Sequence, residues 1–262
     1  MSQTVLTFRL LGQGIAYSAS PAMMAAAFAQ LDLPHRYVLA DVPAADVETT
    51  VEALRRADSG GANVTVPHKT AVAALVDEVS DLAREADAVN TVVRDGDRLI
   101  GHNTDLPATL DAITRLRPDG VGRALLLGAG GAGRAVHLAL RKVGVEHISV
   151  LRRSDGSMAR LDDEIAAADL LVNATPVGTD SDESPVPADL LRPDLAVLDL
   201  VYRPSPTRLV AEARACGAAA EAGAAILLGQ AWRSLELWLG RPAPVEVMRG
   251  ALAAELGGRA DA

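Results

Sequence analysis

An apolar strand runs directly into a glycine-rich loop in the stretch ALLLGAGGAGR, residues 124–134. Gly128, Gly130 and Gly133 have the spacing G-x-G-x-x-G, and a helical pattern follows from Ala135 to Val143. Glycines at this spacing allow a tight turn and a close approach of the backbone, so that N–H groups at the helix start can hold a pyrophosphate. We therefore predict a doubly wound, dinucleotide-binding α/β unit here.

The next predicted strand ends at the position that distinguishes the two nicotinamide cofactors. It closes at Leu151, and Arg152, Arg153 and Ser154 follow it. An acidic residue about 20 residues past the glycines binds the ribose 2′-hydroxyl of NAD, whereas an arginine there accommodates the 2′-phosphate of NADP. The basic residues favour a Rossmann-type domain for NADP, although two solvated arginines at the end of an exposed strand would have the same sequence.

The spacing after this strand predicts a shortened sheet. Only residues 154–168 separate Arg153 from the next predicted strand, which ends at Ala174. In a doubly wound sheet of order 3-2-1-4-5-6, the third strand is an edge strand next to the one that meets the adenosine ribose. A helix and a strand with their turns need more residues than this interval holds, so we expect the edge strand to be absent.

The chain before the glycine loop predicts a second α/β unit with a mixed sheet. Short apolar runs alternate there with helical patterns: Phe8–Leu11 and Pro21–Leu31, Tyr37–Ala40 and Ala44–Ala57, Ala62–Val66 and His68–Val76. Such alternation is typical of βαβ units. Asp95-Gly96 between two apolar runs indicates a type I′ hairpin, and therefore antiparallel strands in the same sheet. A proline and two glycines between Arg117 and Gly122 indicate a domain boundary.

The composition excludes several classes of protein. The 34 acidic and 25 basic residues give a net charge of -9, without a basic block, so a nucleic-acid partner is not expected. The single cysteine, Cys216, lies in an alanine-rich run at 211–220 that we expect to be helical, and it rules out a disulfide within the chain. No signal peptide and no apolar stretch of ~20 residues is present. We expect a soluble cytoplasmic protein without a membrane partner.

Polar side chains follow the predicted strands of the first region. Lys69 lies where α/β proteins place their ligands, and a lysine there can pass a proton to or from a reacting oxygen. Ser18 and Ser20 precede a helix that they could cap, or they could hold a carboxylate. Asn90 interrupts an apolar strand, and Asp105 begins a helix. Each has an ordinary structural interpretation, but together they supply the donors of one site and one proton-transfer pair.

These residues lie in motifs through which the chain resembles the shikimate dehydrogenase family over nearly its whole length. The motifs are S-x-S-P at 18–21, N-V-T-V-P-x-K at 63–69, A-V-N-T at 88–91, N-T-D at 103–105, G-A-G-G-A at 128–132, N-A-T at 173–175, and Gln230 in a C-terminal helix. The resemblance implies NADP-linked interconversion of 3-dehydroshikimate and shikimate, a step of aromatic amino-acid and chorismate biosynthesis. It also implies a substrate domain at 1–106 and 225–262 around an NADP-binding domain at 107–224.

The resemblance further implies a role for individual residues, without a metal. Lys69 and Asp105 would be the catalytic pair, because hydride transfer to a ketone leaves an alkoxide that needs a proton and a nearby positive charge. The implied substrate-binding residues are Ser18, Ser20, Thr65, Asn90, Tyr202 and Gln230. The implied NADP-binding residues are Gly128, Ala129, Gly130, Gly131, Ala132, Arg152, Arg153, Ser154, Leu200 and Gly223. The implied assembly is a monomer or a homodimer.

One departure from the family pattern leaves the substrate open. Members commonly have Pro and His where this chain has Gly14 and Tyr17, beside the expected carboxylate site. Quinate and aminoshikimate share that carboxylate and are alternative substrates. A non-catalytic nucleotide-binding homologue is a further alternative, against which the intact Lys69 and Asp105 argue. An enzyme acting on a folate is disfavoured, because paired serines suit a small carboxylate better than a pterin.

Overall fold

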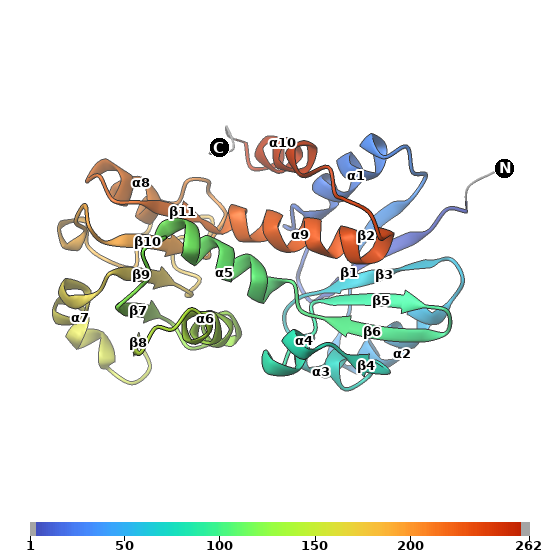
Figure 1. Cartoon of the computed structure of the whole chain (residues 1–262), viewed down its shortest axis with the longest axis horizontal. Helices are drawn as coiled ribbons and strands as arrows, with labels where there is room; N and C mark the ends of the chain where they lie inside the picture. Colours follow the sequence, from blue (N-terminus) through green and yellow to red (C-terminus); the bar gives the residue numbers. More distant parts are fainter. Residues whose placement is uncertain (1–3, 258–262) are drawn as a thin grey trace. The chain divides into compact units, whose positions relative to one another are not determined.

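The computed structural model describes residues 4–257, and these form two compact units, each with its own sheet (Figure 1). Residues 4–105 and 228–257 make up the first unit, and Leu106–Leu227 make up the second. These divisions lie close to the boundaries predicted after residue 106 and before residue 225. The assignment of substrate to one unit and of NADP to the other stays a prediction.

The first unit contains a six-stranded mixed sheet in the order β2-β1-β3-β5-β6-β4. Its strands are β1 (Thr7–Gly12), β2 (Arg36–Asp41), β3 (Ser59–Val64), β4 (Glu78–Val79), β5 (Thr91–Asp95) and β6 (Arg98–His102). β1 pairs in parallel with β2 and β3, whereas β5 is antiparallel to both β3 and β6. The predicted mixed sheet is confirmed, with the two-residue strand β4 in addition.

The hairpin of β5 and β6 is present, but the predicted type I′ turn is wrong. Asp95 pairs with Arg98, so the two loop residues are Gly96 and Asp97. Gly96 has a φ of 60°, and Asp97 is not among the residues with positive φ. A type I′ turn needs positive φ at both loop positions, whereas type II′ needs it only at the first. The turn is therefore of the II′ kind, with glycine at the position that requires it.

Helices and short 3-10 turns surround the mixed sheet. They are α1 (Ser20–Gln30), η1 (Ala44–Asp46), α2 (Val47–Glu52), η2 (Ala53–Arg55), α3 (Lys69–Ala73), α4 (Asp81–Glu85), α9 (Gly223–Leu239) and α10 (Val245–Glu255). The helical pattern at 44–57 is thus divided among three short elements. α1 and α10 lie side by side (Figure 1). The Phe8 ring lies 5.3 Å from that of Phe28 and 4.7 Å from that of Trp238, which joins β1 to α1 and α9.

The second unit contains a fully parallel five-stranded sheet in the order β11-β10-β9-β7-β8. Its strands are β7 (Arg123–Leu127), β8 (His147–Leu151), β9 (Leu170–Asn173), β10 (Ala196–Asp199) and β11 (Ala220–Ala222). Within the described chain, only η3 (Ser157–Arg160) and α7 (Leu161–Ala167) lie between β8 and β9. β8 is therefore an edge strand, and the predicted absence of a third strand is confirmed.

Alternate side chains of β7 supply two apolar cores, one on each face of the parallel sheet. Leu126 packs with Val136 of α6, and Leu125 packs with Ile165 of α7, because successive strand residues point to opposite faces. The helices of this unit are α5 (Asp105–Leu116), α6 (Gly131–Lys142), α7, η4 (Ala188–Leu190) and α8 (Arg208–Ala215). No helix within residues 4–257 is long and apolar enough to cross a membrane.

The alanine-rich run at 211–220 is only partly helical, which corrects the sequence-based expectation. α8 ends at Ala215, and Cys216 is its C-cap. The chain turns at Gly217, which has a φ of 90°, and Ala220–Ala222 then forms β11 beside β10. Glycine adopts this left-handed conformation without a steric penalty, and it commonly ends a helix. The helix therefore stops here, although the surrounding alanines favour a helix.

Candidate active site

The loops that carry the predicted substrate residues meet at one edge of the mixed sheet. β1 and β3 are parallel and both end there, β5 starts there, and β6 ends there. Gln13 N–H donates to the carbonyl of Val66 at 3.1 Å, which joins the loop after β1 to the loop after β3. A Cβ on Gly12 would lie 2.5 Å from Cγ2 of Thr65, so this close approach requires glycine. Ser18 and Ser20 follow the first of these loops.

Lys69 and Asp105 form an ion pair at this edge. The Lys69 Nζ lies 2.7 Å from Oδ2 of Asp105, and the two side chains are 31% and 22% exposed. Lys69 is the first residue of α3, and Asp105 is the first residue of α5. An ammonium has three donors, so one contact to the carboxylate is compatible with a further bond to a ligand. The structure thus joins the two residues that were predicted to transfer the proton.

His68 anchors the loop that delivers Lys69, a role that was not predicted from the sequence. Its side chain is buried, and Nε2 lies 2.6 Å from the carbonyl oxygen of Val42. A carbonyl can only accept, so Nε2 carries the proton. The carbonyl of Lys69 itself accepts from Val89 N–H at 3.0 Å. Side-chain and main-chain bonds therefore fix both residues that open α3.

Asn90 fixes the start of α5. Its Oδ1 accepts from the backbone N–H of Thr104 at 2.7 Å, and its Nδ2 donates to Thr104 Oγ1 at 2.9 Å. Thr104 directly precedes Asp105, so Asn90 sets the position of the carboxylate. Asn90 is also buried. A substrate hydroxyl bound to Asn90 would use the same side-chain amide that already hydrogen-bonds Thr104.

The two serines do not occupy the N-cap position of α1, which is Ala19 without a side-chain cap bond. Ser18 Oγ accepts from the Ser20 N–H at 3.3 Å, so it still satisfies one donor of the first helical turn. Ser20 is buried, and its side chain hydrogen-bonds the hydroxyl of Tyr37. Burial raises the pKa of the Tyr37 phenol far above its ordinary value, while the bond to Ser20 acts in the opposite direction. Tyr37 is therefore a neutral donor, and its hydroxyl donates to Oδ1 of Asn63 at 2.8 Å.

The glycine loop of the second unit is tightly packed at two of its glycines and open at two others. Gly128 has a φ of 95°, and a Cβ there would lie 2.9 Å from the carbonyl oxygen of Ala174. A Cβ on Gly133 would lie 2.3 Å from the carbonyl oxygen of Gly128. The fold itself therefore requires these two glycines. At Gly130 and Gly131 a Cβ would meet no atom within 4 Å, which leaves open space at the start of α6. The N–H groups of a first helical turn lack intrahelical acceptors.

The two arginines after β8 differ in the contacts that they make. Arg152 N–H donates to Ser157 Oγ at 2.8 Å, and its Nε lies 3.8 Å from Oδ2 of Asp155. Arg153 is exposed and makes no hydrogen bond or ion pair with the rest of the described chain. The Arg153 guanidinium is thus available for an anionic ligand, whereas Arg152 already has a carboxylate nearby. Ser154 is exposed, and it lies in the sequence between Arg153 and Asp155.

Four further predicted residues lie after β10 or in α9. Leu200 and Tyr202 follow β10, and Gly223 and Gln230 belong to α9. A Cβ on Gly223 would lie 2.2 Å from the carbonyl oxygen of Leu200, so these two main chains are in close contact. Tyr202 belongs to the second unit, and is not among the residues that gather at the mixed sheet. Gln230 is buried in the part of α9 that belongs to the first unit.

Asp199 holds the loop that carries Tyr202. It is buried, and it accepts from Thr207 Oγ1 at 2.7 Å, Asn173 Nδ2 at 2.8 Å and Val201 N–H at 3.0 Å. Burial raises the pKa of this carboxyl, and the three hydrogen bonds act in the opposite direction. Asp199 was not predicted from the sequence, although it lies at a strand end, the position that indicated the other residues.

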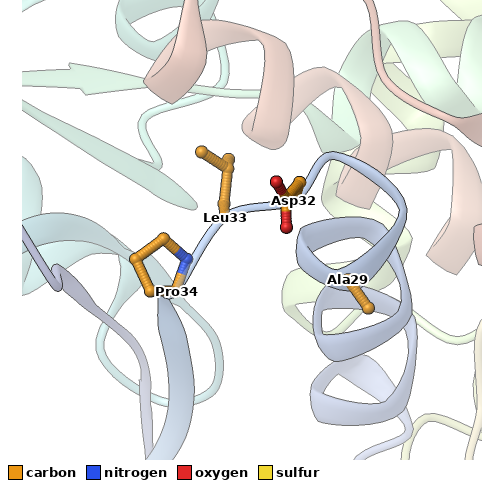
Figure 2. A pocket seen from close by; sticks show the side chains of 4 residues that line it. All are labelled: Ala29, Asp32, Leu33 and Pro34. Atoms are coloured by element: carbon orange, nitrogen blue, oxygen red, sulfur yellow. The ribbon is translucent and has the colours of Figure 1, made fainter. Parts of the chain in front are cut away.

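A surface depression at the end of α1 lies outside this set of residues. Ala29, Asp32, Leu33 and Pro34 line it (Figure 2). None of the four is a predicted site residue, and only one of them carries a charged side chain. The depression therefore does not bear on the chemistry described above.

A parallel sheet with a G-x-G-x-x-G loop, together with a lysine–carboxylate pair at the edge of a separate mixed sheet, is typical of one class of protein, the nicotinamide-dependent dehydrogenases of small polar substrates. Residues 10–92 match the family model of the shikimate dehydrogenase substrate binding domain, and residues 223–253 match that of the shikimate 5′-dehydrogenase C-terminal domain. The shikimate dehydrogenase (NADP(+)) of Symbiobacterium thermophilum is 39% identical over 277 residues, covering 95% of this chain and 94% of that protein.

Solved structures agree with this match. Shikimate 5-dehydrogenase from Thermus thermophilus, in complex with NADP(H) and shikimate, has a TM-score of 0.83 at 39% identity, covering 96% of this chain and 100% of that one. Quinate dehydrogenase from Corynebacterium glutamicum, in complex with NAD, has a TM-score of 0.86 at 31% identity, covering 95% and 99%. The chain belongs to the shikimate dehydrogenase family, and the resemblance seen in its motifs is confirmed.

Proposed function

We propose that this chain catalyses the reversible, NADP-dependent reduction of 3-dehydroshikimate to shikimate, in the route to chorismate and the aromatic amino acids. The observation that carries the proposal is the Lys69–Asp105 pair, with 2.7 Å between Nζ and Oδ2, at the sheet edge where β1, β3 and β6 end and β5 starts. The relative from Symbiobacterium thermophilum is named for this reaction.

Lys69 is the proton-transfer residue of this proposal. NADPH, when bound, supplies the hydride that reaches the ketone carbon. The alkoxide that results needs a proton and a positive charge at hydrogen-bonding distance, and the Lys69 ammonium offers both. In the oxidation of shikimate the Lys69 amine accepts the hydroxyl proton. Asp105 holds the ammonium in place, and a carboxylate can accept a further hydrogen bond from a ring hydroxyl.

The substrate contacts follow from the surrounding donors. Ser18 and Ser20 would bind the carboxylate, since hydroxyl groups donate well to an anion. Thr65, Asn90, Gln230 and Tyr202 would bind the ring hydroxyls. This division places the carboxylate near the start of α1 and the reacting oxygen near Lys69.

The second unit would hold the cofactor. The backbone of Gly128, Ala129, Gly130, Gly131 and Ala132 would bind the pyrophosphate, because the space beside Gly130 and Gly131 is open. Arg152, Arg153 and Ser154 would bind the 2′-phosphate, and Leu200 and Gly223 would contact the cofactor through their adjoining main chains. A cytoplasmic location, the absence of a nucleic-acid partner, and a monomeric or homodimeric state stay predictions.

Quinate is the second candidate substrate, and a specific observation favours keeping it. Tyr17 is 52% exposed, and Gly14 has a φ of 68°, which a proline cannot adopt, so this loop departs from the Pro and His pattern before Ser18. Initial rates with shikimate, quinate and aminoshikimate, each with NADP⁺ and with NAD⁺, separate the alternatives. Turnover of shikimate with NADP⁺ supports the proposal, and no turnover with any pair favours a non-catalytic homologue.

A further inference from the structure

A buried hydroxyl on α9, that of Ser234, joins four segments of the first unit. Its Oγ lies 2.9 Å from Nδ2 of Asn63, 2.8 Å from Oγ1 of Thr91 and 3.2 Å from Oγ1 of Thr104. It also donates to the carbonyl of Gln230 at 2.9 Å. A hydroxyl has one proton to donate and two lone pairs to accept with. Because the proton goes to Gln230, the groups of Asn63, Thr91 and Thr104 share the two lone pairs.

Each partner of Ser234 lies close in sequence to a residue of the proposed site, or belongs to it. Asn63 comes two residues before Thr65 on the strand β3 and its following loop. Thr91 directly follows Asn90, and Thr104 directly precedes Asp105. The fourth partner, Gln230, is itself a proposed substrate residue one helical turn before Ser234. One hydroxyl therefore connects the main supports of the substrate site.

Ser234, like Gln230, is a buried polar residue of α9. The neighbouring buried positions of α9, Ala231 and Leu235, are apolar, and both are fully buried, as Ser234 is. Burying a hydroxyl is unfavourable unless hydrogen bonds compensate for the lost water. An alanine at position 234 would avoid the cost of burying a hydroxyl. It would, however, leave the polar groups of Asn63 and Thr91 with fewer hydrogen-bond partners. Ser234 therefore makes hydrogen bonds to Asn63 and Thr91 that an apolar residue at this position could not make.

We propose that Ser234 is a positioning residue for the substrate, fixing the α9 turn of Gln230 relative to Asn90. This inference rests on the proposed function, because its effect is on the binding of shikimate. Ser234 contacts Thr91 Oγ1 and Thr104 Oγ1, and both of these hydroxyls hydrogen-bond the side chain of Asn90, a proposed ligand contact. Its loss should therefore change how well the substrate is held, while Lys69 and Asp105 remain paired.

The test compares three variants with the wild-type protein, using shikimate and NADP⁺. Ser234→Ala removes the hydroxyl, and Ser234→Cys removes most of its hydrogen bonding while filling the same volume. Ser59→Ala is the matched control, since Ser59 is a buried serine of the same unit whose hydroxyl accepts from Gly61 N–H at 3.3 Å. We expect both Ser234 variants to raise KM for shikimate about tenfold, the effect of one net hydrogen bond. The values of kcat and of KM for NADP⁺ should stay within about twofold.

The outcomes separate this inference from the proposed function. A wild-type protein that does not oxidise shikimate overturns both. A wild-type protein that turns over normally, with an unchanged KM in the Ser234 variants, overturns this inference alone. An equal rise of KM in Ser59→Ala also overturns it, because the effect would then follow from lost stability. If Ser234→Ala does not fold, Ser234→Cys gives the same comparison, and melting temperatures recorded for every variant show which ones are folded.

Discussion

Lys69 and Asp105 are 36 residues apart in sequence, and each is the first residue of a helix. We predict that Lys69→Ala lowers kcat by about 10²-fold or more, the usual effect of removing a positioned acid or base. The dissociation constant of NADP⁺ should change little, because Lys69 lies in the first unit and the glycine loop in the second. Steady-state kinetics and a cofactor titration measure the two quantities.

Lys142, an exposed lysine at the end of α6, provides the control for this prediction. Lys142→Ala removes the same charge from the surface of the second unit, and it should leave kcat unchanged. A Lys69→Ala protein with near-wild-type kcat would mean that another group transfers the proton.

Ser18 and Ser20 allow a second prediction at the scale of residues. Each charge-assisted hydrogen bond to a carboxylate contributes roughly 1.5–3 kcal/mol, so replacing both serines by alanine should raise KM for shikimate strongly. The affinity for NADP⁺ should not change. The competing interpretation is structural, since Ser18 bonds the Ser20 N–H at the start of α1. A double variant that melts at a lower temperature but keeps wild-type kinetics would support that interpretation instead.

The edge position of β8 leads to a prediction about how the protein distinguishes NADP⁺ from NAD⁺. No further strand flanks the segment after β8 within the described residues, so few groups surround a 2′-phosphate there. Arg153 is free of protein partners in that part of the chain, and a charge-assisted arginine contact corresponds to about one to two decades of preference. We predict that Arg153→Ala removes most of the preference for NADP⁺ over NAD⁺.

The measurement is kcat/KM for both cofactors, on the wild-type and variant proteins. Arg160→Ala is the control, because Arg160 pairs with Glu164 on the surface one element further along the chain. It should leave the cofactor ratio unchanged. A wild-type protein that prefers NAD⁺ would contradict this account of the segment after β8.

Arg55 links the η2 turn to the strand β4 region, and this link predicts a dependence of stability on pH. Its Nη1 lies 2.6 Å from Oδ2 of Asp77, and that bond, followed by one from the Leu99 N–H, lowers the pKa of Asp77 from 3.8 to about 2. A carboxyl with a lowered pKa in the folded state stabilises the fold above its unfolded pKa of 3.8 and loses that contribution as the pH falls toward about 2.

We therefore predict that Asp77→Asn is less stable than the wild-type protein at neutral pH, and that the difference shrinks between pH 3.8 and about 2. Urea unfolding across this range measures it. Asp81→Asn is a suitable control, because Asp81 is a more exposed carboxylate that pairs with Arg84 within one helical turn. A difference between Asp77→Asn and the wild type that stays constant with pH would show that the ion pair does not contribute.

At the scale of the whole molecule, local sequence signals predicted the long elements well and the short ones poorly. The glycine loop and the spacing after Arg153 were sufficient for a parallel sheet without its third strand. β4 and β11 have two and three residues, too few to show a periodicity. The hairpin was predicted, but its turn type depends on which residues pair, and Asp95 joined the strand rather than the loop.

The candidate site shows a similar limit. Motifs around Lys69, Asn90 and Asp105 predicted that these residues lie together, because strand ends of one sheet share an edge. Their supports were not predictable in the same way. Ser234 reaches Thr91 across 143 residues of sequence, and no pattern in a single chain indicates such a contact. The hydrogen bond from Asn90 to Thr104 could likewise not be predicted from the sequence and is seen only in the structure.

We expect this chain to oxidise shikimate to 3-dehydroshikimate with NADP⁺. The most direct measurement incubates the purified wild-type protein with shikimate and NADP⁺, and determines both the NADPH formed and the identity of the organic product. We predict 3-dehydroshikimate and NADPH in equal amounts, together with one proton released, and a lower rate with quinate or with NAD⁺. Absence of NADPH formation with shikimate, or formation of NADPH with quinate alone, would contradict it.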